Sequence, residues 1–277
     1  MGGEVEYLIL RRVITIAKKL GKLFMNGVGD VGEQFVKRLD DYIVAKDKEN
    51  QRQGSNCFKP SGIYSCKREL YYMRCGVDID YNFNQQGISI CETGSHRHEI
   101  IQQYLESMSK EGYGDIEWVD VGEYLLNNGG EKYGTVVVEK KGMETKLRNH
   151  IYDFSFLCDG IVKFKDTYYI LEIKTCTSMI FNKLTEPLEK HRQQVTCYSM
   201  ATGIDNVIFI YENRDVLTHK GFYYKVTDTD KLLIANKIAD IGEYVARGEL
   251  PPKEKDKCKY CDYKEICRKD YNPKEEE

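Results

Sequence analysis

The sequence lacks a long hydrophobic run, a recognisable leader and an excess of positive charge. No apolar run approaches the roughly 20 residues that a membrane-spanning helix needs. The opening MGGEVEYLIL has neither the layout of a secretory signal nor the Ser or Thr at position 6 that myristoylation requires. We therefore expect a cytoplasmic protein, or one of the host cytoplasm if the chain is viral, with no membrane partner.

The formal net charge of -3 argues against a protein that coats nucleic acid indiscriminately, although it is compatible with a local basic groove. With 277 residues, of which 41% are hydrophobic, the chain can bury a substantial core. Ten cysteines without a secretory signal favour metal or cluster binding, rather than disulfides, for those that are clustered.

Apolar residues at helical spacing predict two N-terminal helices, over residues 4–25 and 33–45. The apolar face of the second is formed by Phe35, Val36, Leu39, Tyr42 and Ile43. The polar stretch 46–55 predicts a linker. We therefore expect a helical appendage over residues 1–50 and a main domain over residues 55–277.

The main domain alternates between helical and strand patterns. Helices are predicted over 92–110, 184–202 and 228–247, and strands over 135–139, 153–164, 167–175, 206–212 and 221–226. This layout predicts an α/β fold with a central mixed sheet flanked by helices.

A β-hairpin is predicted over residues 153–175, because two runs rich in aliphatic and aromatic residues are separated by the short polar pair Lys165 and Asp166. A turn centred on that pair places Asp159 directly opposite Glu172. Carboxylates in that arrangement repel each other, so the pair predicts an oxygen-binding cation such as Mg²⁺ or Mn²⁺.

Lys174 falls on the same face as Glu172, because strand side chains alternate. It could hold a water molecule or a phosphate oxygen there. The alternative is an ordinary exposed hairpin in which Glu172 and Lys174 are solvated.

Two helices flank this hairpin in the sequence. In helix 92–110, His96 and His98 lie on opposite sides of the apolar stripe, so periodicity does not choose between them, and either could be a surface or capping residue. In helix 184–202, His191, Gln194 and Tyr198 share one face, which could equally be a plain polar face.

The C-terminal cysteines Cys258, Cys261 and Cys267 form a C-x2-C-x5-C pattern, whose two-residue spacer lets two thiolates reach one centre. A complete set of metal ligands needs a fourth side chain, and Cys66 is the cysteine best placed to supply it. The spacing suits either Zn²⁺ or an iron–sulfur cluster.

These motifs occur in a fixed order: Cys66, Gly94-x3-His98, Asp159, Glu172-x-Lys174, Gln194-x3-Tyr198 and the C-terminal cysteines. In this order the chain resembles the RecB-type branch of the PD-(D/E)XK nucleases over residues 58–268. It is similar in particular to the iron–sulfur CRISPR-associated exonucleases, their viral relatives and the AddB nuclease domain. It departs from the family name at Cys158, where Pro would stand.

The resemblance implies that His98, Asp159, Glu172 and the backbone carbonyl of Ile173 ligate a catalytic Mn²⁺ or Mg²⁺, and it selects His98 over His96. Lys174 would orient or help to deprotonate the attacking water. The metal would polarise the scissile phosphate and lower the pKa of the water.

The resemblance also implies that Gln194 and Tyr198 position the substrate and Lys174. It implies a [4Fe-4S] cluster, with zinc as the alternative, on four cysteines: Cys66, Cys258, Cys261 and Cys267. Such a cluster would act as a structural staple between the tail and the start of the domain.

The leading hypothesis is a metal-dependent deoxyribonuclease acting as an exonuclease on single-stranded ends, in recombination, repair, replication or CRISPR-type processing. Endonuclease cleavage stays open. Candidate DNA-binding residues are Lys67, Arg68, Lys190 and Arg192. Candidate protein partners are a second copy of the chain and recombination or CRISPR proteins. The alternative is a catalytically inactive DNA-binding or assembly protein of the same fold.

Overall fold

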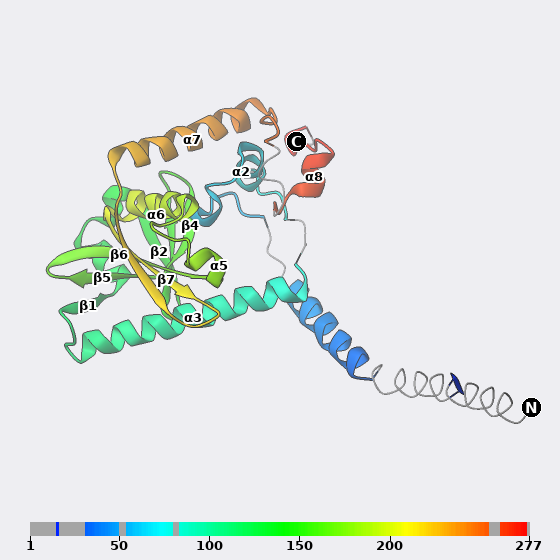
Figure 1. Cartoon of the computed structure of the whole chain (residues 1–277). Coiled ribbons are helices and arrows are strands. Elements are labelled where there is room, and N and C mark those ends of the chain that lie inside the picture. Colours follow the sequence, from blue (N-terminus) through cyan, green and yellow to red (C-terminus); the bar gives the residue numbers. More distant parts are fainter. Residues whose placement is uncertain (1–14, 17–30, 50–53, 80–82, 255–260, 276–277) are drawn as a thin grey trace, which may run out of the picture. The chain divides into compact units, whose positions relative to one another are not determined.

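The computed structural model describes residues 15–16, 31–49, 54–79, 83–254 and 261–275 (Figure 1). The chain divides into two compact units. One comprises Met1–Gln51 with Phe83–Ser89, and the other comprises Arg52–Asn82 with Ile90–Glu277. No helix in the described ranges is both long and apolar enough to cross a membrane.

The first unit contains a helix over residues 31–49. The prediction that a linker begins at residue 46 was therefore wrong for residues 46–49, which continue the helix. Most of the predicted apolar face is exposed, namely Phe35, Val36, Leu39 and Tyr42. The predicted helix over 4–25 lies outside the described residues, apart from helical residues 15–16.

The second unit holds two sheets and the helices around them. The helices are η1 (Pro60–Gly62), α2 (Lys67–Arg74), α3 (Gln85–Lys110, which begins in the first unit), α4 (Val121–Asn127), η2 (Gly130–Tyr133), α5 (Ser178–Phe181), α6 (Glu189–Thr202), α7 (Asp228–Arg247) and α8 (Lys264–Arg268). The strands are β1 (Ile116–Val119), β2 (Thr135–Lys141), β3 (Glu144–Asn149), β4 (Phe154–Cys158), β5 (Gly160–Phe164), β6 (Thr167–Cys176), β7 (Asn206–Asn213) and β8 (His219–Lys225).

The larger sheet is mixed and has the strand order β1-β5-β6-β7-β8. Only β6 and β7 pair in parallel, and the other neighbours are antiparallel. The smaller sheet has the order β2-β3-β4. Helices flank the larger sheet, so the predicted α/β class with a central mixed sheet is confirmed (Figure 1).

The predicted hairpin has its turn where expected. Lys165 and Asp166 both have positive φ, of 47° and 61°, as a two-residue type I′ turn requires. The register Gly160↔Leu171 follows from that turn. Asp159 lies one residue before β5, so the ladder stops short of the predicted Asp159–Glu172 pair.

The single strand predicted over 153–164 was wrong, because the chain changes sheets inside it. Residues up to Cys158 belong to β4 in the smaller sheet, and residues from Gly160 belong to β5 in the larger one. A Cβ on Gly160 would lie 2.5 Å from the Trp118 ring, so this change of sheet uses the small size of glycine. Asp159 is thus the residue at which the two sheets meet.

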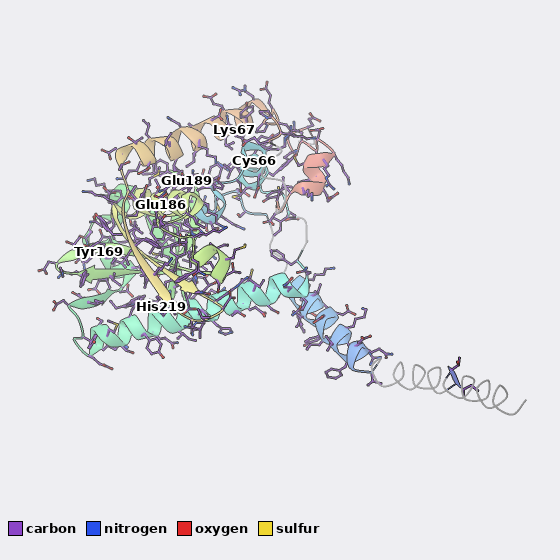
Figure 2. The ribbon with its side chains drawn as sticks, in the orientation of Figure 1. Cys66, Lys67, Tyr169, Glu186, Glu189 and His219 are labelled. Atoms are coloured by element: carbon purple, nitrogen blue, oxygen red, sulfur yellow. The ribbon has the colours of Figure 1, made fainter. Side chains whose placement is uncertain are left out.

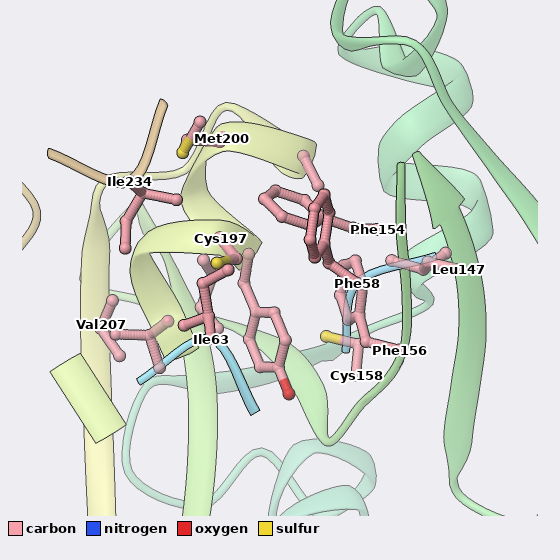
Figure 3. Packing of buried hydrophobic residues seen from close by; sticks show 14 of the residues in the cluster. Phe58, Ile63, Leu147, Phe154, Phe156, Cys158, Cys197, Met200, Val207 and Ile234 are labelled. Atoms are coloured by element: carbon pink, nitrogen blue, oxygen red, sulfur yellow. The ribbon is translucent and has the colours of Figure 1, made fainter. Parts of the chain in front are cut away.

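Helices α3 and α6 contact β6 through different residues. Ile101 of α3 packs in one small cluster with Leu171 and Ile173 of β6. Helix α6 belongs to the main core instead, where Val195 and Ala201 are fully buried. Figure 3 shows part of this core, in which Cys197 and Met200 lie near Val207 and Ile234 while Phe58, Phe154 and Phe156 lie near Leu147.

Helix boundaries follow local capping chemistry. Helix α7 matches its predicted bounds, with a capping box formed by Thr227 and Asp230 at its start. Helix α6 begins at Glu189 instead of residue 184, because Pro187 keeps the residue before it out of the helical region. Helix α4 was not among the predicted helices, and the side chain of Asp120 caps it.

Candidate metal centre

Asp159 is held from two directions at the junction of the sheets. Its Oδ2 accepts a 2.7 Å hydrogen bond from the backbone N–H of Ile173. Its backbone carbonyl accepts a 2.6 Å hydrogen bond from Nε2 of Gln102 on α3. These contacts fix the carboxylate, and they leave Oδ1 directed to another partner.

That partner is His98 of α3, whose Nδ1 lies 3.7 Å from Oδ1 of Asp159. Glu144 completes a group in which potential ligand atoms of His98, Glu144 and Asp159 all lie within 4.8 Å of one another. His96 is exposed on the same helix. The structure therefore places His98, and not His96, beside Asp159.

Glu144 was missed by the sequence analysis. It begins β3, and the register Thr145↔Cys158 between β3 and β4 brings it next to Asp159. Nothing in the sequence around Glu144 marks it as functional. The pairing of β3 with β4 would have had to be predicted first, and the Gly142-centred turn before Glu144 gives no information about that pairing.

Glu172 lies on β6, with a side chain that is 1% exposed. Lys174 forms an ion pair with it, with Nζ 2.5 Å from Oε1. Apart from this ion pair, neither carboxylate oxygen of Glu172 has a hydrogen-bond partner among the described residues. A buried carboxylate in that condition is costly unless a further cation neutralises it.

The pKa values of Glu172 and Glu144 also indicate a site that favours a bound cation. Burial raises the pKa of Glu172, and the charge of Asp159 raises it further, while Lys174 opposes the shift. The pKa of Glu144 is also raised, by burial and by the Asp159 charge. Carboxylates are therefore crowded enough here to hinder one another's ionisation.

The pKa values of the two cationic side chains, His98 and Lys174, are raised as well, which favours their charged forms. Burial acts to lower the pKa of His98, but the hydrogen-bonding and charge contributions of Asp159 outweigh it, so that pKa is raised. Burial likewise acts to lower the pKa of Lys174, and the charges of Glu172 and Asp159 outweigh it. The surroundings therefore favour positive charge.

A divalent cation fits these residues. Carboxylate oxygens suit Mg²⁺ and Mn²⁺, and an imidazole nitrogen suits transition metals such as Mn²⁺. The oxygens of buried Glu172, which among the described residues are paired with Lys174 alone, provide further ligand capacity near Asp159 and His98. The protein thus offers a candidate divalent metal site.

Arg97, the residue before His98, fixes helix α3 to the larger sheet. Arg97 donates two hydrogen bonds to Glu212 of β7, of 2.8 Å from Nε and 2.6 Å from Nη2. Glu212 is fully buried. One turn before His98, a Cβ on Gly94 would lie 3.4 Å from Oγ1 of Thr175, so the glycine permits the close approach of helix and strand.

Gln194 and Tyr198 lie on one buried face of α6, as their spacing predicted. Nε2 of Gln194 donates to the Tyr198 hydroxyl over 2.7 Å, and that hydroxyl donates to the Leu157 carbonyl over 3.3 Å. The Tyr198 ring also stacks on Phe156, with ring centroids 4.4 Å apart. Both side chains thus secure β4 just before Asp159.

Three of the four cysteines expected to bind a cluster line one cavity of about 210 Å³, in which α2 meets the C-terminal tail. These are Cys66, Cys261 and Cys267. Cys66 precedes α2, close to Lys67 (Figure 2). The fourth, Cys258, lies outside the described residues.

The predicted DNA-binding residues differ in how far they are already engaged. Arg68 is buried, donating to the Pro251 carbonyl and to Asp270. Lys67 pairs with Asp240. Arg192 pairs with the exposed Glu186 and Glu189, both labelled in Figure 2, and Lys190 is exposed.

Comparison with known proteins gives a distant structural likeness. No protein-family model matches the sequence, and no curated protein matches it. The crystal structure of SSO0001 is similar at 17% identity and a TM-score of 0.44, over 83% of this chain and 96% of that one. An alkaline exonuclease from Laribacter hongkongensis is similar at 15% identity and a TM-score of 0.40, over 69% of this chain and 89% of that one. The same exonuclease in complex with dAMP gives 15% identity and a TM-score of 0.41 over the same shares.

Proposed function

We propose that this protein is a Mg²⁺- or Mn²⁺-dependent deoxyribonuclease that hydrolyses phosphodiester bonds, working as an exonuclease on single-stranded ends. The observation that carries the proposal is the buried Glu172 carboxylate, whose one partner among the described residues is the ammonium group of Lys174 and which shares its crowded site with Asp159. A folded protein retains such a site where a bound ion offsets its cost.

His98, Glu144 and Asp159 would hold the cation, with Glu172 and the Ile173 carbonyl as the further ligands that the family resemblance implies. When bound, the ion would polarise the scissile phosphate and lower the pKa of a water molecule. Asp159 would be kept in position for this by its hydrogen bond from Ile173.

Lys174 would orient the attacking water or a phosphate oxygen through its ammonium group, which Glu172 holds on the same face of β6. Gln194 and Tyr198 would act indirectly, without contacting the metal. Their hydrogen bonds reach the Leu157 carbonyl, and so support the strand that leads into Asp159.

The cysteines that share the α2 cavity support a second part of the proposal, a [4Fe-4S] cluster on Cys66, Cys258, Cys261 and Cys267, with zinc as the alternative occupant. Its role would be structural. The substrate would be DNA with a free end, and exposed Lys190 is the first of the predicted basic residues to test for phosphate contact.

The test is digestion of end-labelled single- and double-stranded DNA, with 5′ or 3′ ends blocked, beside a circular substrate. Wild-type protein purified anaerobically should degrade the linear DNA with Mn²⁺ or Mg²⁺ and lose activity with a chelator. Asp159→Asn and Lys174→Ala should each abolish cleavage.

Asp166→Asn is the matched control, because Asp166 is an exposed hairpin-turn residue in a conformation that Asn adopts easily. It should cleave like wild type. Binding of DNA without cleavage under all metal conditions would instead establish the inactive DNA-binding alternative. Undiminished cleavage by both site variants would refute the site.

A further inference from the structure

His191 lies at the start of α6, beside a tyrosine of the central sheet. Its Nδ1 is 2.6 Å from the hydroxyl oxygen of Tyr211. Tyr211 is the β7 register partner of Lys174 on β6. In a parallel pair such neighbours project from the same face of the sheet, so His191 is joined through Tyr211 to the face that carries Glu172 and Lys174.

The hydrogen bonds of Tyr211 determine where the imidazole proton lies. The backbone N–H of Leu188 donates to the Tyr211 oxygen over 3.1 Å. Tyr211 is fully buried, and His191 is the one acceptor within reach of its hydroxyl in the described part of the chain. A buried hydroxyl that donates to nothing is costly, so the O–H of Tyr211 donates to Nδ1 of His191.

Two consequences follow for the ring. Nδ1 is an acceptor, so the proton of the neutral imidazole is on Nε2. Nε2 has no hydrogen-bond partner among the residues that the structure describes. The ring also stays neutral, because burial, with the charges of Lys174 and Lys190 in addition, lowers the pKa of His191 to about 2.

We propose that His191 is a further active-site residue of the proposed nuclease, a neutral donor whose Nε2–H binds a non-bridging oxygen of the scissile phosphate. The role rests on the proposed function, and Tyr211 is its positioning residue. A donor fixed in advance stabilises charge that develops on the phosphate without rearranging during the reaction.

The first measurement uses the metal-free protein and needs no activity. Nitrogen-15 NMR of the labelled imidazole should show His191 as the Nε2–H tautomer, with Nδ1 unprotonated. In Tyr211→Phe this preference should be lost. A ring protonated on Nδ1 in the wild-type protein would overturn the proposal.

The second measurement is single-turnover cleavage of end-labelled DNA with Mn²⁺. His191→Ala should lower the rate about a hundredfold, with little change in the substrate concentration at half-saturation. His191→Gln, which keeps an N–H donor near the position of Nε2, should recover much of the rate. His150→Ala removes an exposed histidine and should cleave at the wild-type rate.

These results separate the two proposals. If wild-type protein cleaves DNA and folded His191→Ala cleaves equally fast, the role of His191 is wrong while the nuclease assignment stands. If wild-type protein cleaves no DNA with either metal, both fail.

Discussion

At the scale of single residues, the candidate ligands differ in how they are held. Asp159 receives hydrogen bonds on its side chain and on its backbone carbonyl, from β6 and α3. Glu144 instead owes its position to the register of β3 with β4. A fixed carboxylate loses less conformational freedom on binding a metal than a mobile one, so Asp159 should be the anchor of the site and Glu144 an additional ligand.

Glu144→Gln should therefore weaken Mn²⁺ binding without abolishing it. We expect about a tenfold loss of affinity, which removes about 1.4 kcal/mol of the stabilisation that saturating metal gives. Without metal the variant should be at least as stable as wild type, because burial, with the charge of Asp159 in addition, raises the pKa of Glu144 and so disfavours its charged form.

Calorimetric titration with Mn²⁺ and thermal unfolding with and without metal measure both effects. Glu139→Gln, on the neighbouring exposed strand β2, is the control and should bind Mn²⁺ like wild type. Equal Mn²⁺ affinity in Glu144→Gln and wild type would remove Glu144 from the ligand set.

Arg97 and Glu212 form an ion pair between a partly buried guanidinium and a fully buried carboxylate, and this pair fixes α3 to β7. Removing only the cation leaves a buried carboxylate without its main partner. Arg97→Met should therefore lower the free energy of unfolding by about 3–5 kcal/mol. In urea unfolding, the double variant Arg97→Met with Glu212→Met should recover a large part of the loss, and additive losses would contradict this explanation.

The same pair predicts a pH dependence. The hydrogen bond from Arg97 is the main cause of a lowered pKa for Glu212. A carboxyl group whose pKa is lower when folded contributes stability above its unfolded pKa, and this contribution disappears as the pH falls through the folded pKa. Stability should therefore decline below about pH 4.5, and measurement of unfolding against pH should show a shallower decline in the Glu212→Met background.

At the scale of elements, the change of sheet at Asp159 and Gly160 creates the site. Most of the hairpin was predictable from its sequence, because alternating apolar runs and a polar break specify strands and a turn. The partner of each strand was not. The β3–β4 register depends on packing between residues far apart in the chain, so Glu144 had no signal of its own. Gln194 fell on a helix face that periodicity could indicate, whereas His98 was selected over His96 by the family resemblance alone.

Gly160→Ala tests this junction. The added methyl group would lie 2.5 Å from the ring of Trp118, so ring or strand must move. We expect a loss of about 1–3 kcal/mol in unfolding free energy. Trp118 is the only tryptophan of the chain, so its fluorescence should report the displacement directly.

Gly242→Ala is the matched control, since that glycine lies within α7 with open space where its Cβ would be. It should be slightly stabilised, by about 0.5–1 kcal/mol, because alanine is the better helix former. Unchanged fluorescence and stability in Gly160→Ala would show that the junction tolerates a side chain.

At the scale of the whole molecule, the second unit is closed by contacts between its beginning and its end. Hydroxyl groups of two fully buried tyrosines of α2 reach the tail: Tyr71 donates to Asn272, and Tyr72 donates to the Tyr271 carbonyl. Arg68 adds its pair with Asp270. The cysteine spacing indicated that the two regions meet, but it carried no information about these polar contacts, which come from residues without a motif.

Cys267→Ala tests what the shared cavity holds. Anaerobically purified wild-type protein should be brown and contain iron and sulfide, and Cys267→Ala should lose both together with much of its thermal stability. Cys91→Ala, which removes an exposed cysteine outside the cavity, should keep them. Metal analysis that finds stoichiometric zinc in a colourless protein would replace the cluster with a zinc site.

The sheet change at Asp159 has a mechanical consequence. His98 comes from the helix that packs against the larger sheet, Glu144 belongs to the smaller sheet, and Asp159 joins the two. An ion shared by these side chains would act as a removable cross-link between the sheets, closing the stretches of chain that separate the three ligands. Without the metal, the smaller sheet should unfold locally more often, independently of the larger one. The rate of amide hydrogen exchange in β3 and β4 should therefore be lower when the metal is bound, even at residues that do not contact the site.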